Sequence, residues 1–191
     1  MLISEAEFCQ RNSDDREEFV DGEVVAMSPE SLDSEQLRWF LGRLLLNFVE
    51  AGDLGIVCGP NFQIRLRQGL RRIPDLLFIH RDHAHRVHPT YLEGAPDMAL
   101  EVVSADSHAR DWREKYLEYQ QGGVAEYWVV DPLYRRAELY RLAEDRFVTV
   151  PAESGWLCSA VVPGFHLKVE WLWMSPLPKL QTALSEPWPL K

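Results

Sequence analysis

The chain has few of the features that mark secreted or membrane proteins. It contains only three cysteines in 191 residues, Cys9, Cys58 and Cys158, far apart and without a Cys-x-x-Cys pair, so no disulfide framework is expected. No uncharged apolar run reaches the roughly 18 residues that a membrane span requires. The acidic opening also lacks the apolar centre of a secretory signal. We therefore expect a cytoplasmic protein with reduced thiols and no membrane contact.

Basic residues are also in deficit. Lysine and arginine total 20 against 30 aspartates and glutamates, which gives a formal net charge of −10. This balance excludes a strongly basic protein that coats nucleic acid without specificity, although it leaves room for a local basic patch. With 46% hydrophobic and 26% charged residues, the chain is typical of a globular protein. We expect one domain over residues 1–175 and an irregular, proline-punctuated tail over 176–191.

Turn signals and hydrophobic periodicity predict a mixed α/β fold. Asp21-Gly22 between two β-rich segments predicts a hairpin. Apolar residues at three- and four-residue steps predict a helix from Ser34 to about residue 51. A strand over 98–104, a helix over 107–121 and a strand over 124–131 predict a right-handed βαβ unit. Further strands are expected at 55–58, 62–67, 71–79, 137–142 and 146–150, and a tryptophan-rich strand or strand followed by a helix at 165–174. This order predicts an α/β or α+β fold, with a central mixed sheet flanked by helices.

Two strands that otherwise look fully buried each contain one carboxylate. Asp75 directly follows Pro74, and Glu101 interrupts the apolar segment 98–103. An unpaired buried charge costs several kcal/mol, so such residues need a reason. If the two strands are neighbours, the carboxylates converge, and with a backbone carbonyl they would form a hard oxygen site for Mg²⁺ or Mn²⁺. The alternative is that each carboxylate pairs with a buried arginine or caps a strand end.

A lysine follows on the next expected helix. Helical spacing gives Lys115 a broad face shared with Asp111 and the aromatic residues Trp112, Tyr116 and Tyr119. The aromatic side chains would turn this face towards the protein and draw Lys115 inward. Its ammonium could then position or deprotonate a metal-bound water. The alternative is a lysine with a buried stem whose ammonium pairs with Asp111, one turn earlier.

Two further groups of charged residues stand out. Four histidines, His80, His83, His85 and His88, lie in or directly before the loop over 81–93. Their spacing matches no standard metal pattern, which favours an ordinary polar loop over a transition-metal site. Four arginines surround the turn just before Asp75. They could contact phosphates on either side of a scissile bond, or guard an exposed edge strand with charge, and both explanations stay open. These arginines are Arg65, Arg67, Arg71 and Arg72.

Taken in order, these motifs resemble the PD-(D/E)XK nuclease superfamily. The segments that carry the resemblance are Pro74-Asp75, 101–104, Lys115 and 123–132. More narrowly, the chain is similar to the bacterial "putative restriction endonuclease" branch of that superfamily, which is expanded in cyanobacteria. Segments 18–25 and 162–167 also fit that branch, so the resemblance covers roughly residues 5–175.

The resemblance implies a restriction-endonuclease-like core and a role for each matching residue. Asp75 and Glu101 would ligate a divalent metal ion together with the carbonyl of Val102. Lys115 would be the catalytic lysine, moved from the strand to the helix. The superfamily's usual lysine position, two residues after Glu101, is occupied by valine here. Glu18 would be an accessory acidic residue and a candidate second metal ligand.

The function implied by the resemblance is that of a Mg²⁺- or Mn²⁺-dependent endonuclease that hydrolyses DNA phosphodiester bonds. A homodimer is expected, because cutting two strands requires two sites. One departure favours an alternative. The branch often has a histidine at the start of the first long helix, where this chain has Ser34-Glu35-Gln36. The alternatives are therefore a catalytically inactive nuclease-fold module for binding or regulation, and a metal-dependent hydrolase of small phosphoesters.

Overall fold

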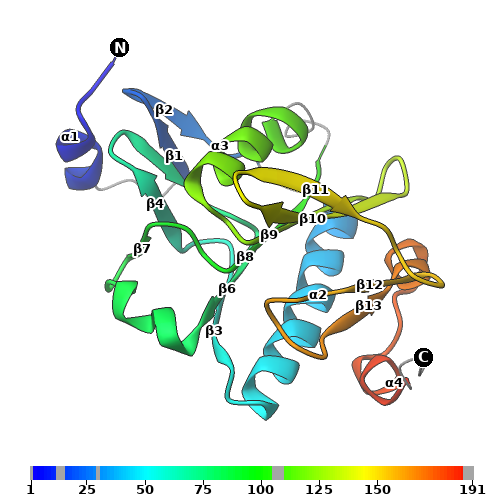
Figure 1. The fold of residues 1–191 in the computed structure, drawn as a ribbon. Helices are drawn as coiled ribbons and strands as arrows, with labels where there is room; N and C mark the ends of the chain where they lie inside the picture. Colours follow the sequence, from blue (N-terminus) through cyan, green and yellow to red (C-terminus); the bar gives the residue numbers. More distant parts are fainter. Residues whose placement is uncertain (1, 12–15, 29–30, 105–109, 187–191) are drawn as a thin grey trace.

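Two large β-sheets form the framework of the protein (Figure 1). The computed structural model describes residues 2–11, 16–28, 31–104 and 110–186. The first sheet has six strands in the order β11-β10-β9-β8-β6-β3, and the second has five in the order β2-β1-β5-β4-β7. The strands of the first sheet are β3 (Gly55–Cys58), β6 (Leu76–His80), β8 (Met98–Val102), β9 (Glu126–Asp131), β10 (Arg136–Ala143) and β11 (Arg146–Val150). Those of the second are β1 (Glu17–Val20), β2 (Glu23–Ala26), β4 (Gln63–Arg67), β5 (Leu70–Arg72) and β7 (Tyr91–Glu93).

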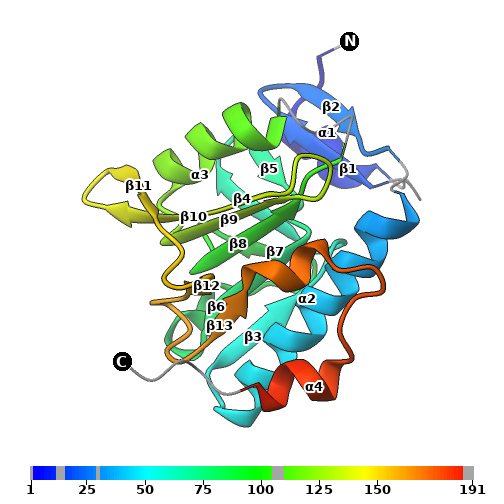
Figure 2. The same cartoon turned by 90° about the vertical axis from the view of Figure 1, so that its right-hand side faces the viewer.

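Both faces of the six-stranded sheet are covered by helices (Figure 2). Helix α2 (Leu32–Ala51) packs on the face that carries the even-numbered residues of β6, β8 and β9, and α3 (Lys115–Gly122) packs on the face that carries the odd-numbered ones. Alternating side chains therefore enter two separate apolar cores, which explains why these strands are almost continuously apolar in sequence. Glu101 belongs to the odd-numbered set and so lies on the α3 face.

The predicted βαβ unit is present, with a difference at its helix. Strands β8 and β9 are parallel and in register from Met98↔Glu126 to Val102↔Val130. The connecting helix was expected over 107–121. The structure instead has a π-helical turn over Arg110–Glu114 followed by α3, and residues 105–109 lie outside the described residues. A π turn widens the helix by one residue, and such turns are frequent at functional sites.

The predicted hairpin at Asp21-Gly22 is also confirmed. Val20 pairs with Glu23, and both loop residues have positive φ, 46° for Asp21 and 98° for Gly22. Two successive positive φ values define the tight turn that matches the twist of a hairpin, and Asp-Gly adopts them at low cost. Strand β1 of this hairpin then pairs with β5, which brings Glu18 next to the arginine-rich turn.

Several elements differ from the sequence-based expectations. Helix α1 (Glu5–Gln10) was not expected, although Ser4 and Glu7 form a capping box at its start. The histidine-rich segment, expected as a loop, contains a 3₁₀ turn over Arg81–Arg86 and strand β7. Within the tail expected to be irregular, α4 (Leu180–Ser185) buries Ala183 in the same core as α2. Short apolar helices of this kind form because tertiary packing stabilises them, not because of local propensity.

The tryptophan-rich segment follows the strand-then-helix expectation. Strand β13 (His166–Lys168) pairs with β12 (Trp156–Cys158) and is followed by a 3₁₀ turn over Val169–Trp173. Trp171 is buried there against Trp156. Among the described helices, none combines the length and apolar content needed to cross a membrane.

Candidate active site

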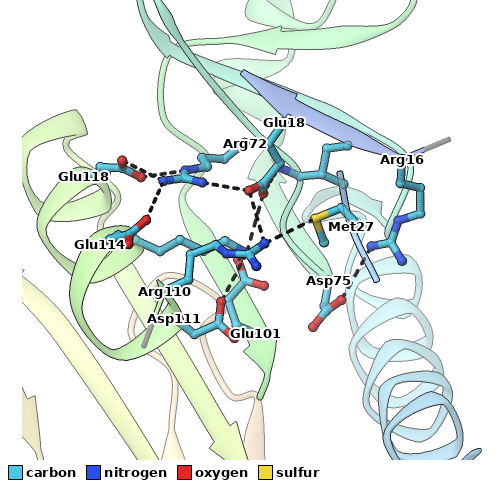
Figure 3. Close-up of polar contacts among 12 residues, drawn as sticks. Arg16, Glu18, Met27, Arg72, Asp75, Glu101, Arg110, Asp111, Glu114 and Glu118 are labelled. Atoms are coloured by element: carbon cyan, nitrogen blue, oxygen red, sulfur yellow. Dashed lines mark hydrogen bonds and ion pairs between the residues drawn. The ribbon is translucent and has the colours of Figure 1, made fainter. Parts of the chain in front are cut away.

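The three acidic residues singled out in the sequence, Glu18, Asp75 and Glu101, lie where the two sheets meet (Figure 3), and Lys115 contacts two of them. Glu18 comes from β1, Asp75 directly precedes β6, Glu101 lies in β8, and Lys115 is the first residue of α3. All four side chains are buried, with exposed fractions of 0%, 4%, 2% and 1% in that order. Segments far apart in the chain therefore bring three carboxylates and one ammonium into the interior.

Lys115 is at the centre of this group. Its Nζ lies 2.9 Å from Oε1 of Glu101, 3.3 Å from Oδ1 of Asp111 and 3.6 Å from Oε1 of Glu18. Burial alone would lower the pKa of Lys115, but the surrounding carboxylates raise it well above its ordinary value. The lysine therefore carries its charge in the interior. Its pairing with Asp111 matches the alternative considered from the sequence, yet the ammonium is buried together with its partners.

Glu101 has an environment that disfavours its charge. Burial raises its pKa to about 8, and although Lys115 acts against this, the charges of Asp111 and Asp75 act in the same direction. The hydroxyl of Tyr119 donates a hydrogen bond of 2.7 Å to Oε1 of Glu101. Glu101 and Asp111 both lie within ion-pair distance of the Lys115 ammonium. A proton on Glu101 or an additional cation would relieve the unfavourable burial of its charge.

Asp75 and Glu101 face each other across neighbouring strands. Strand β6 pairs with β8 in antiparallel register, with Leu76 opposite Leu100, and continuing that register places Asp75 opposite Glu101. Opposed residues of an antiparallel pair project from the same side of the sheet, with Cβ atoms about 4.5–5.5 Å apart. The condition set by the sequence, that the two strands be neighbours, is therefore met.

The carboxylate of Asp75 is held by donors from three directions. Its Oδ2 accepts a 2.8 Å hydrogen bond from the backbone N–H of Val102. Its Oδ1 lies 3.1 Å from Nη1 of Arg38 on α2 and 3.9 Å from Nη2 of Arg16, just before β1. The Val102 bond fixes Asp75 beside the backbone of β8. The two arginines give it positive neighbours on its other side, and Figure 3 shows Arg16 next to it.

Glu18 is held mainly by Arg72. The Nη1 of Arg72 lies 2.8 Å from Oε2 of Glu18, and the backbone N–H of Ile73 donates to Oε1 at 3.0 Å. Burial works against ionisation, but the positive charges of Lys115 and Arg72 lower the pKa of Glu18 below its ordinary value. Glu18 therefore stays ionised and links the five-stranded sheet to the helix that carries Lys115.

The four arginines before Asp75 are all engaged with carboxylates. Arg72 is buried and also pairs with Glu118 at 2.7 Å, so it belongs to the interior cluster. Arg71, which is also buried, pairs with Glu5, as does the partly exposed Arg65, and the exposed Arg67 pairs with Asp21. Contact between these arginines and phosphates stays a prediction. For Arg72 it would require the interior pairs to open.

The ion pairs of Glu5 give a pH-dependent contribution to stability. Its carboxylate accepts hydrogen bonds from Nε of Arg65 at 2.6 Å, Nε of Arg71 at 2.8 Å and the backbone N–H of Gly69 at 3.0 Å. The Arg65 bond is the main cause that lowers the pKa of Glu5 from 4.5 to about 2. A lowered pKa stabilises the fold above pH 4.5, and that contribution is lost as the pH falls towards 2.

We expect Glu5→Gln to lower the free energy of unfolding by about 1–2 kcal/mol at pH 7, after allowance for screening by solvent. The difference from the wild type should shrink steadily between pH 4.5 and pH 2. Urea unfolding at pH 7, 4 and 2.5 measures it. An unchanged difference at pH 2.5 would contradict the assigned protonation of Glu5.

The described residues offer no ready-made cage for a metal. Among them, no group of three or more histidine, cysteine, aspartate or glutamate side chains is arranged to hold an ion. The histidines of the 81–93 segment and its borders are used separately: Nδ1 of His83 lies 2.8 Å from Asp97, and the ring of His88 stacks on Tyr91. Any ion at the Asp75–Glu101 pair would therefore have two protein carboxylates at most.

Sequence reasoning missed two residues that touch Asp75. Arg38 was not expected to be buried, yet it is 6% exposed. It lies beside Leu37 and three residues before Leu41, both on the apolar face of the helix, and this position was a usable signal for burial. Arg16 had no such signal, because its contact depends on the pairing of β1 with β5, which no local pattern reveals.

Comparisons with known proteins agree with this geometry. The family model Uma2, described as "Putative restriction endonuclease", matches residues 5–170, and the chain therefore belongs to that family. A crystal structure described as "a putative nuclease belonging to DUF820", from Anabaena variabilis ATCC 29413, has a similar fold, with a TM-score of 0.72 and 15% sequence identity over 89% of this chain and 97% of that chain. A search of the curated proteins finds no match. The resemblance to PD-(D/E)XK nucleases and the nuclease-like α+β fold are thus confirmed.

Proposed function

We propose that the protein is a Mg²⁺- or Mn²⁺-dependent endonuclease that hydrolyses DNA phosphodiester bonds at Asp75, Glu101 and Lys115. The observation that carries the proposal is the register of β6 and β8, which sets two buried carboxylates opposite each other beside a buried ammonium. Family membership and the nuclease-like fold support it.

The donor set fits magnesium. Mg²⁺ is typically bound by one or two carboxylates and keeps several waters and substrate phosphate oxygens as its other ligands. Asp75 and Glu101 would supply the two carboxylates, and the carbonyl of Val102 would add a third oxygen. Burial and the neighbouring carboxylates raise the pKa of Glu101, and a bound cation would favour its charged form. Lack of a three-residue cage is therefore compatible with this ion.

Each protein group then has a role in phosphodiester hydrolysis. The ion, when bound, would polarise a phosphoryl oxygen and lower the pKa of a bound water. Lys115 would orient the attacking water or stabilise the charge that develops on phosphate, since it remains an ammonium in the interior. Tyr119 holds Oε1 of Glu101 in place, and the N–H of Val102 holds Asp75. Glu18 fixes Lys115 from the opposite side and is the candidate second ligand.

Calorimetric titration with Mn²⁺ tests the proposed ligands directly. We expect Asp75→Asn and Glu101→Gln each to weaken binding at least about 10- to 100-fold, because changes that merely disturb the partners of a ligand already cost that much. Supercoiled plasmid and a chromogenic phosphodiester, each with Mg²⁺ and with EDTA, then separate a DNA endonuclease from a hydrolase of small phosphoesters. Metal binding that survives both substitutions would show that the carboxylates are structural.

One observation favours the alternative of a catalytically inactive module. Asp75, Glu101 and Glu18 are each already satisfied by donors of the protein itself. A metal ion would have to displace the Lys115 ammonium from Glu101, which costs free energy. The Mn²⁺ titration of the unchanged protein decides between the two, because an inactive module would take up no ion at this pair.

The proposal includes a homodimer in the cytoplasm. Cutting both strands of DNA requires two sites, which a two-fold dimer supplies, and sedimentation velocity measures the mass. All three cysteines lie in the described part of the chain, and none of them forms a disulfide there. Reduced thiols fit a reducing compartment.

A further inference from the structure

A cavity of about 530 Å³ opens beside Asp75 on the side of the five-stranded sheet. We call it the arginine cavity, because Arg11, Arg16 and Arg71 line it together with one acidic residue, Glu17. Glu17 is paired with Arg11 at 2.9 Å. The remaining walls carry polar amides and hydroxyls as well as apolar side chains. This volume lies within the range of about 300–1,000 Å³ that is usual for ligand pockets.

A second cavity, of about 210 Å³, lies between α2 and the end of β3. We call it the tryptophan cavity. Among the described residues, its walls include Trp39, Leu46 and two arginines, Arg38 and Arg43, and no acidic side chain. Trp39 is 62% exposed, which is high for the largest apolar side chain, and its Nε1 donates a 2.8 Å hydrogen bond to Glu35. The indole is thus held in position while one of its surfaces stays accessible.

The two cavities adjoin at Asp75. Ile73 lines the arginine cavity and Leu76 the tryptophan cavity, so the segment between them, with Asp75, separates the two. The same holds for Asn61 and Pro60, adjacent residues that line one cavity each. The two arginines in contact with Asp75 are divided in the same way, with Arg16 in the first cavity and Arg38 in the second. Asp75 itself lines neither cavity, and we call the two cavities together with the segment that carries Asp75 the path.

The residues that line this path are mostly basic, whereas the chain as a whole is acidic. Among the described residues, five arginines and one glutamate line the two cavities, and Glu5, Glu35 and Asp75 pair with three of these arginines. The whole chain, by contrast, has a net charge of −10. A positively lined path in an acidic protein favours a polyanion bound along its length. An aromatic side chain next to such a path is the usual platform for an unpaired base. The tryptophan cavity is also larger than the roughly 150 Å³ cavity known to hold a benzene ring.

We infer that the path binds a single strand of DNA across Asp75, with an unpaired base against Trp39 and the neighbouring phosphates among the arginines of the arginine cavity. The inference rests on the proposed function and specifies its substrate class. Bases of an intact duplex are stacked inside the helix and cannot enter a cavity unless they are flipped out. The substrate is therefore DNA with unpaired nucleotides at the cleavage point.

Fluorescence anisotropy with a labelled 12-nucleotide single strand and the matching duplex, in EDTA so that the DNA stays uncut, tests this inference. We expect the single strand to bind more tightly than the duplex. Trp39→Ala should weaken single-strand binding about 5- to 100-fold, the range found for loss of one base–aromatic stack, and Trp39→Phe should retain most of it. Leu184→Ala is the matched control, because Leu184 is 46% exposed on α4 and lines neither cavity.

The outcomes separate this inference from the proposed function. Duplex binding at least as tight as single-strand binding, or equal losses in Trp39→Ala and Leu184→Ala, would overturn the inference while leaving metal-dependent hydrolysis untouched. Glu101→Gln should bind the single strand at least as tightly as the wild type. If Trp39→Ala weakens single-strand binding as expected but no cleavage occurs with any metal, the inference about the path is supported and the endonuclease proposal fails.

Discussion

Glu101→Gln is expected to lower Mg²⁺-dependent cleavage of plasmid DNA by at least about 10³-fold while the protein remains folded. Loss of a group essential to a catalytic unit has effects of this size or larger. Glutamine keeps the shape of the side chain and can still accept the hydrogen bond from Tyr119, but it carries no charge with which to bind a cation. The substitution also removes the carboxylate closest to Lys115. Initial rates of plasmid nicking, at saturating Mg²⁺, measure the loss.

Glu126 offers a matched control for this substitution. It is a fully buried glutamate on β9, next to β8. Its carboxylate is engaged with structural donors, the Ser159 hydroxyl at 2.8 Å and the backbone N–H of Ala160 at 2.7 Å. Glu126→Gln should therefore lower stability and leave cleavage within a few-fold of the wild type, below its unfolding temperature. Comparable losses of cleavage in the two variants would mean that burial of charge, and not the chemistry of Glu101, controls activity.

The candidate site could be found from the sequence because its charged residues lie in segments that are otherwise apolar. Asp75 and Glu101 stand in strands whose other residues are apolar, and Lys115 shares a helix face with aromatic residues. Each local pattern predicts burial from periodicity alone, and a charge at a buried position requires a partner. The structure places all three in the interior, next to one another.

Partners of these residues could not be found in the same way. Asp75 pairs with Arg38 over 37 positions and Glu18 with Arg72 over 54. Such contacts depend on which strands pair, and a one-strand sequence pattern carries no information about its neighbours. The same reason accounts for the division into two sheets. Each strand's alternation predicts a buried face, but not which of the two sheets it joins.

The helix that carries Lys115 shows how far a local pattern extends. Its aromatic face was readable, and the end at Gly122-Gly123 is confirmed by the left-handed Gly123, with φ of 85°. The π turn over Arg110–Glu114 could not be predicted from the sequence. A π turn costs free energy in isolation and persists only when side-chain contacts stabilise it. Here Asp111 pairs with Lys115 across that turn.

Arg72 should contribute more to stability than any other arginine of the turn before Asp75. It is 1% exposed and joins Glu18 of β1 to Glu118 of α3, at 2.8 and 2.7 Å. Arg72→Met would leave Glu18 buried with Lys115 at 3.6 Å, Arg110 at 4.0 Å and the backbone N–H of Ile73 near it. Removing one partner of a buried ion pair typically costs about 3–5 kcal/mol, because the other charge stays behind without compensation. We expect a decrease of that size in the free energy of unfolding, measured by urea denaturation at pH 7.

Two further variants show that the loss comes from the buried charge. Arg67 pairs with Asp21 at 2.7 Å, but both side chains are more than half exposed, so Arg67→Met should cost at most about 1 kcal/mol. The double variant Arg72→Met with Glu18→Gln removes the stranded charge and should recover part of the stability, which a double-mutant cycle quantifies. If Arg72→Met and Arg67→Met cost the same, the charge of Glu18 is compensated by its other neighbours, Lys115 and Arg110. The link between the two sheets and the helix that carries Lys115 would then not depend on Arg72.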